Sequence, residues 1–388
     1  MKTKHASGLY DPLLAFARQS EWADLRHLFV LVWMMIGLIE EGRVNLTCWI
    51  SRVETKAVYA QSTQRRFGRW LHNPRINVTR LYRCLLRAAL ADWQDPDLYL
   101  CLDTSSLWDQ YCLIRVCVVH RGRAVPVGWR VLRHNSTSVG LSAYQELLWL
   151  IARILPPAPK VILLADRGFV DADLMRYVRQ QLQWHYRIRL KDNFWFKQRG
   201  RDWRQVKQCH LGSGEALLFH HVRLYKQRPV DGVHLAMAHV AGTQEQWCLL
   251  SSEPTTLQTF HQYGLRFDIE ENFLDDKSNG FELERSMLRN AIALSRLCFV
   301  LAVTTLFLTL QGTAVVAAGK RRWIDPHWQR GSSDLKIGWH WAKGVATRGW
   351  TLFQCTSLVS NNDPEPASAS RWQREQRQAR LEFTVRFA

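Results

Sequence analysis

The sequence predicts an α/β protein with a helical N-terminal domain (residues 1–94), a central α/β domain (95–318) and a helical C-terminal region (319–388). Of its 388 residues, 47% are hydrophobic and 22% are charged, so the chain can bury a substantial core and is not disordered by composition. Strand-like apolar runs appear after residue 95, whereas helical spacing dominates before it and again after about residue 265.

The first 92 residues carry a surplus of positive charge. They contain 14 Lys and Arg against seven Asp and Glu. Arg65, Arg66 and Arg69 occupy positions i, i+1 and i+4 of a predicted helix. A solvated helix face and a DNA-binding helix both explain this pattern, and the sequence leaves the choice open.

The central domain begins with a regular order of elements. We expect strands at 98–102, 111–120 and 124–132, a helix at 144–155, a strand at 161–165, a helix at 174–182 and a strand at 185–190. This order is expected of a ribonuclease-H-like α/β domain. Residues 191–250 break it with strand-like runs between Gly turns, which predicts an inserted β-rich unit. Helical spacing resumes near Leu265 and extends, with or without a break, to about Ala318. The polar tail after Ser360 contains a basic stretch with Arg371, Arg374 and Arg377.

Charge and cysteine usage narrow the function classes. The formal net charge of +18 points to an anionic polymer or an anionic membrane surface as partner. Nine cysteines without a CxxC pair argue against the common zinc modules and a secreted disulfide framework. The segment Leu297–Ala318 is about long enough to span a bilayer, but its Thr, Gln and Gly residues favour a buried core helix. No signal peptide is evident, so we expect a cytoplasmic protein without membrane contact.

Two aspartates share one sequence context. Asp103 and Asp166 each follow an apolar run that we expect to be a buried strand. Each alone is explained as a turn or helix-cap aspartate. Together, in a basic protein, they favour a shared site for a divalent metal ion, because Mg²⁺ prefers carboxylate oxygens.

A third acidic side chain is expected from the helix after residue 260. At about 100° per residue, Tyr263, Arg266, Glu270 and Lys277 fall on one narrow stripe of a continuous helix, whereas Glu271 falls off it. A surface ladder of ion pairs explains the same spacing, since Arg266 and Glu270 are four residues apart.

These residues carry a family resemblance. Tyr263-x2-Arg266-x3-Glu270-x6-Lys277 resembles the YREK signature of DDE transposases from bacterial insertion sequences, family four. The stretch Asp166-Arg167-Gly168-Phe169 looks like the motif around the second aspartate of that family, and Asp103 stands where the first would be. The resemblance covers about residues 95–300.

The resemblance implies an enzyme that cuts insertion-sequence ends and joins them to target DNA. It implies two Mg²⁺ or Mn²⁺ ions held by Asp103, Asp166 and Glu270, without a covalent protein nucleophile. It also implies DNA contacts: Arg266 and Lys277 would neutralise phosphates, Tyr263 would offer its hydroxyl or ring to a strand end, and Arg167 is a further candidate.

A second basic region lies at residues 176–209, with 10 Lys and Arg against two Asp and with interleaved aromatic residues. We expect Trp184, Tyr186 and Phe194 to belong to the core. Trp195 and Trp203 lie among charged neighbours and are candidates for stacking on a flipped nucleotide.

The predicted partners are double-stranded DNA, both terminal repeats and target, and a second copy of the chain on paired ends in the bacterial nucleoid. Two alternative functions also involve DNA. One is a nuclease that cleaves DNA without strand transfer, and the other is an inactive domesticated relative that only binds DNA. A basic membrane protein is a third. A serine hydrolase is disfavoured because no Gly-x-Ser-x-Gly elbow is present.

Overall fold

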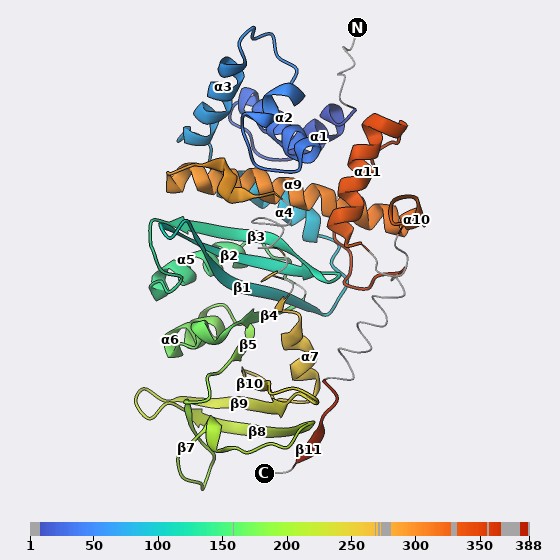
Figure 1. Ribbon diagram of the computed structural model, residues 1–388. Helices are drawn as coiled ribbons and strands as arrows, with labels where there is room; N and C mark the ends of the chain where they lie inside the picture. Colours follow the sequence, from blue (N-terminus) through green and yellow to red (C-terminus); the bar gives the residue numbers. More distant parts are fainter. Residues whose placement is uncertain are drawn as a thin grey trace.

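The computed structural model shows a large mixed sheet covered at one end by helices (Figure 1). It describes residues 8–157, 159–267, 269–270, 272, 281–326, 332–354, 357–365 and 381–386. The strands are β1 Asp97–Leu107, β2 Tyr111–His120, β3 Arg123–Leu132, β4 Lys160–Ala165, β5 His185–Arg189, β6 Trp195–Lys197, β7 Arg204–Gln205, β8 Glu215–Leu224, β9 Val230–His239, β10 Gln246–Ser251 and β11 Thr384–Arg386. The α-helices are α1 Tyr10–Ala17, α2 Leu25–Glu41, α3 Ala60–His72, α4 Val78–Leu90, α5 Leu141–Ala152, α6 Ala172–Arg176, α7 Gln258–Gly264, α9 Ala291–Ala317, α10 Arg321–Ile324 and α11 Asp334–Arg348.

The first half of the sheet has the predicted element order: β1, β2, β3, α5, β4, α6 and β5. β1, β2 and β3 form an antiparallel meander, and β4 and β5 extend it in parallel from β1. The β2–β3 hairpin turns over two residues, Arg121 and Gly122, which both have positive φ (49° and 74°). This is the backbone of the two-residue hairpin turn whose twist matches that of the strands.

The β-rich segment 191–250 continues the same sheet. Strand β10 pairs with β5, and the order then runs β10-β9-β8-β6-β7. The C-terminal β11 adds in parallel to β8, a pairing that the local sequence did not indicate. Phe383, just before β11, packs against Phe260 of α7 with ring centroids 4.9 Å apart.

Helices cover both faces of the meander. The indole of Trp129 on β3 donates to the carbonyl of Ser295 in α9, at 3.0 Å. On the opposite face, Gly128 meets Ile151 of α5. Because Trp129 pairs with Arg115, and Arg115 with Asp103, the α9 face of the meander is also the face that carries Asp103.

The long apolar helix α9 lies between the N-terminal helices and the meander (Figure 1). It is long and apolar enough to cross a membrane, but 83% of its most apolar stretch is buried inside the protein. This burial favours the predicted core helix. One hydrophobic cluster joins α1–α4, α9 and the first half of the sheet. α11 crosses α9 so closely that a Cβ on Gly338 would lie 1.8 Å from the carbonyl oxygen of Leu308.

The helical stretch predicted from about Leu265 to Ala318, with or without a break, is interrupted in the structure. The described residues Phe267, Ile269, Glu270 and Asn272 are helical. α7 ends at Gly264, and residues 281–290 contain only the 3-10 turn Leu283–Ser286. Glu282 and Met287 flank this turn with positive φ, which interrupts any helix there. α9 begins after Asn290, whose side chain accepts hydrogen bonds from the N–H groups of Ile292 and Ala293.

Candidate active site

Asp103 and Asp166 lie on neighbouring parallel strands. The pairing of β1 with β4 ends at Leu102 opposite Ala165, so the two aspartates are the next residues along each strand. The sequence placed Asp103 directly after a strand. In the structure β1 continues to Leu107 through its pairing with β2, so Asp103 lies within the strand. The sheet therefore brings these two carboxylates together, as predicted.

Asp103 is held in a poorly solvated position, with its side chain only 17% exposed. Burial raises the pKa of Asp103 to about 6; the Thr104 N–H and Arg266 oppose that rise, and Asp166 and Glu270 add to it. All three predicted acidic residues are thus close enough to interact electrostatically. One oxygen of Asp103 accepts from the Thr104 N–H at 2.7 Å, and the other faces Arg266.

Asp166 is half-buried and begins the short 3-10 turn Arg167–Phe169. Its Oδ1 accepts a hydrogen bond of 2.7 Å from the N–H of Gly168. Asp166 therefore does serve as a cap, the simpler interpretation of its sequence context. This bond also fixes the direction of the carboxylate beside Asp103. The neighbouring Arg167 is exposed and free to meet a ligand from solvent.

Arg266 connects Asp103 to Glu270. Its Nη1 lies 3.5 Å from Oδ2 of Asp103, and its Nη2 donates to Oε1 of Glu270. The Arg266 side chain is 7% exposed, whereas that of Glu270 is 48% exposed. The predicted i, i+4 pair is therefore present, but it is not a ladder on a solvated surface, because its cation is buried against Asp103.

The other residues of the predicted stripe are placed differently or lie outside the description. Tyr263 is fully buried and packs edge-on against Trp247 at 5.7 Å. Burial raises the pKa of Tyr263 to about 12, with Arg266 opposing that rise. The structure therefore places its ring in the core, not at a surface that meets a strand end. Lys277 and Glu271 lie outside the described residues, as do Arg371, Arg374 and Arg377.

Two buried residues that the sequence analysis did not select support the segment around Glu270. Arg115 of β2 is fully buried and pairs across the strands with Asp103. Its Nη1 donates to Oδ1 of Asn272 at 2.8 Å. An arginine in the middle of an otherwise apolar strand is the signal that would have identified it, because buried charges require partners.

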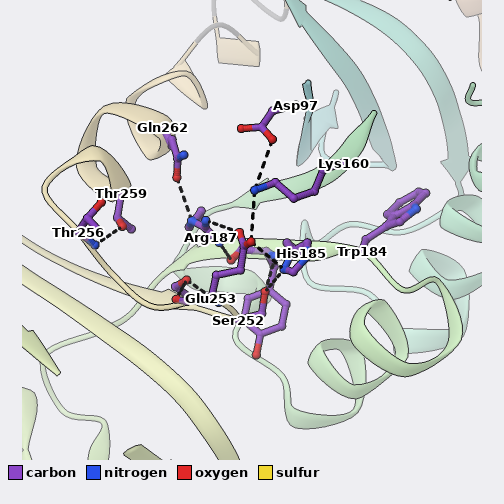
Figure 2. Close-up of polar contacts among 12 residues, drawn as sticks. Asp97, Lys160, Trp184, His185, Arg187, Ser252, Glu253, Thr256, Thr259 and Gln262 are labelled. Atoms are coloured by element: carbon purple, nitrogen blue, oxygen red, sulfur yellow. Dashed lines mark hydrogen bonds and ion pairs between the residues drawn. The ribbon is translucent and has the colours of Figure 1, made fainter. Parts of the chain in front are cut away.

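A second network contacts α7 through Gln262 (Figure 2). Arg187 of β5 donates to Oε2 of Glu253 at 2.7 Å and to Oε1 of Gln262 at 3.2 Å. Lys160 joins the network at 3.2 Å from Glu253 and 3.4 Å from Asp97. Because Gln262 is four residues before Arg266, this network fixes the part of the chain that presents Arg266 to Asp103.

The carboxylate set has the donor chemistry of a site for Mg²⁺ or Mn²⁺. Within the described ranges, however, no three His, Cys, Asp or Glu side chains lie close enough together to hold one ion. The guanidinium of Arg266 occupies the position between Asp103 and Glu270.

Most aromatic residues of the basic region 176–209 are buried or partly exposed as the sequence predicted. Trp184 and Tyr186 are buried, and Phe194 is half-buried. Trp195 is also half-buried and lies beneath Lys226, whose Nζ is 3.7 Å from the ring centroid. Trp195 lines an open hollow of about 450 Å³ with Asn193, Phe194, Tyr225, Lys226 and Gln227. Trp203 is half-buried beside the exposed Arg201 and Asp202.

Helix α3 presents the predicted basic face. Arg65 and Arg69 are exposed, whereas Arg66 is half-buried and lies near the ring of Phe67. Burial lowers the pKa of Arg66. The opposite face of α3 buries Thr63, Phe67, Trp70 and Leu71. The exposed arginines are thus fixed on the surface by a buried apolar face.

Comparison with known proteins finds a similarity to one family of domains. Residues 132–307 match the family model described as the transposase DDE domain. The matched range contains Asp166 and Glu270 and begins after Asp103. This match supports a DDE transposase.

Among solved structures, the chain is similar to a piggyBac transposase in a synaptic complex with hairpin DNA. The identity is 9% and the TM-score 0.39, over 89% of this chain and 79% of that chain. No curated protein matches the sequence.

Proposed function

We propose that the protein is a DNA transposase of the family-four insertion-sequence type, which cuts element ends and joins them to target DNA. The proposal rests on the placement of Asp103 beside Asp166 on neighbouring strands, and of Glu270 across Arg266 from Asp103. These residues belong to a chain whose residues 132–307 match the transposase DDE domain. The strand order β3-β2-β1-β4-β5, with β1 and β4 side by side, supports a ribonuclease-H-like catalytic domain.

Asp103, Asp166 and Glu270 would hold two Mg²⁺ or Mn²⁺ ions at a scissile phosphate. Such ions activate a water or a 3′-hydroxyl and stabilise the leaving oxygen. The chain itself positions the carboxylates: β1 places Asp103, the Gly168 N–H orients Asp166, and Arg266 keeps Glu270 near Asp103 before an ion or substrate binds. The exposed Glu270 is the carboxylate best able to adjust as substrate enters.

DNA contacts are proposed on three surfaces. The exposed arginines of α3, Arg65 and Arg69 with the adjacent Arg66, would contact phosphates of the element end. Trp195 and Trp203 would stack on bases beside the cut, Trp195 from the hollow that it lines. Arg167, Arg266 and Lys277 would lie near the scissile phosphate, with Tyr263 supporting Arg266 from the core. We further propose a homodimer on paired ends in the bacterial cytoplasm.

The decisive experiment uses duplexes that carry the DNA flanking the gene, with Mg²⁺. Asp103→Ala, Asp166→Ala and Glu270→Ala should each abolish strand cleavage yet bind the duplex within a few-fold of the parent in gel shifts. Glu146→Ala, an exposed glutamate of α5, is the matched control and should cleave normally. Activity in Glu270→Ala with loss in Glu271→Ala would overturn the assignment of the third carboxylate. Joining of pre-cut ends to a target plasmid separates a transposase from a nuclease.

A further inference from the structure

The guanidinium of Arg266 takes up the two carboxylates that the proposed metal site needs. Its two terminal nitrogens face different residues, Nη1 toward Asp103 and Nη2 toward Glu270. Asp103 and Glu270 come from distant parts of the chain, and in the described structure Arg266 is the cation in contact with both. Arg266 thus has the position of an internal counter-ion.

A divalent ion cannot share this position with the guanidinium. Mg²⁺ binds carboxylate oxygens at about 2.0–2.1 Å, so an ion between Asp103 and Glu270 requires their oxygens to face it directly. Oδ2 of Asp103 and Oε1 of Glu270 are the atoms that face Arg266 instead. This explains why, within the described chain, no three acidic or histidine side chains are gathered closely enough for an ion.

Arg266 has surroundings that keep it charged and close to the site when it is displaced. Its guanidinium lies 5.1 Å from the ring of Phe267 and 6.0 Å from that of Tyr263. Aromatic faces attract cations but do not neutralise them. A guanidinium withdrawn from both carboxylates therefore needs a new anion, and a DNA phosphate has the matching bidentate geometry.

We propose that Arg266 competes with the divalent ion for Asp103 and Glu270, so that the free protein binds the ion weakly until a phosphate takes over the guanidinium. This inference rests on the proposed metal site. It assigns to Arg266 a role before substrate binding, in addition to the phosphate contact. Removal of Arg266 should therefore strengthen ion binding in the absence of DNA.

The test is titration of the DNA-free protein with Mn²⁺, followed by electron paramagnetic resonance of the free ion. Arg266→Gln should bind Mn²⁺ at least tenfold more tightly than the parent. Arg130→Gln is the control for a general change in charge, because Arg130 pairs with Glu146 on the surface at 2.6 Å and should leave the affinity unchanged. Asp103→Asn combined with Arg266→Gln should lose the gain, which places the ion at the carboxylates.

Arg266→Lys keeps the experiment informative if Arg266→Gln does not fold. Lysine presents one ammonium in place of two separated N–H groups, so it cannot face both carboxylates in the same way. The Mn²⁺ affinity of Arg266→Lys should therefore lie between those of the parent and of Arg266→Gln. If both Arg266 variants bind Mn²⁺ no more tightly than the parent, at a site that still depends on Asp103, the proposed competition is wrong but the metal site stands. Absence of Asp103-dependent binding in every protein, with or without end DNA, overturns the metal site and the competition together.

Discussion

Replacement of Asp103 by Asn should stabilise the metal-free protein at neutral pH. Burial raises the pKa of Asp103 to about 6 from its ordinary value of 3.8, with Thr104 and Arg266 opposing and the two other carboxylates adding to the rise. The ionised carboxylate is therefore less favourable in the folded protein than in the unfolded chain. Asn has nearly the same shape without the charge, so it removes this cost.

The size and pH dependence follow from the same shift. A difference of about two pKa units corresponds to about 3 kcal/mol. Between about pH 4 and 6 the folded carboxyl keeps a proton that the unfolded one has lost, so the free energy of unfolding falls as pH rises. Above about pH 6 the cost is constant. The advantage of the Asn variant should grow from about 1 kcal/mol at pH 4.5 to about 3 kcal/mol at pH 8.

Thermal melts in EDTA at these two pH values provide the measurement. For a chain of 388 residues, about 3 kcal/mol corresponds to about 4 °C in Tm. Asp231→Asn, which removes an exposed partner of Arg223, is the control and should change Tm little at either pH. A lower Tm for Asp103→Asn at pH 8, or a gain that does not depend on pH, would refute the reasoning.

Three further predictions address the framework and the DNA surface. Arg187→Met should lower the free energy of unfolding in urea by about 2 kcal/mol, because Glu253 and Gln262 lose a charged donor. The control Arg189→Met, at a more exposed pair, should lower it by less than about 1 kcal/mol. Equal losses would contradict the network's role. Gly338→Ala should destabilise the protein by about 3 kcal/mol or more, because the added methyl group clashes with α9. Gly68→Ala, on the open face of α3, should stabilise it by about 1 kcal/mol. Thermal melts measure both changes. DNA affinity should fall with salt at a log–log slope of about −0.9 per phosphate contact, measured by fluorescence anisotropy, and a slope near zero would exclude phosphate-dominated binding.

The sheet and its two aspartates were accessible from the sequence because their signals are local. The runs at 111–120 and 124–132 are β-branched and separated by Arg121-Gly122-Arg123, and they form β2 and β3 as expected. Since parallel strands end at the same edge, two aspartates after two apolar runs could be placed side by side. The spacing of Arg266 and Glu270 likewise predicted their contact.

The features that the sequence did not reveal depend on distant contacts. The pairing of β11 with β8 joins residues that are more than 160 positions apart, so no local pattern indicates it. Residues 281–290 have a helix-like composition, yet Glu282 and Met287 adopt positive φ there. The burial of Arg266 follows from Asp103, which lies on another element, and a helical stripe alone cannot distinguish it from an exposed ladder.

The residues that conflict with ordinary folding rules are concentrated around one position. Asp103 keeps a charge in a poorly solvated strand, Arg115 is buried opposite it, and Arg266 is buried against two carboxylates. Each arrangement costs stability unless its partner is present, and an apolar replacement of the whole group would pack at least as well. Such conflicts are expected at functional sites, where the missing stabilisation comes from a ligand. Here Asp103 and Glu270 share the single guanidinium of Arg266. A divalent cation at the two carboxylates and a phosphate at the guanidinium would together give each group a partner of its own.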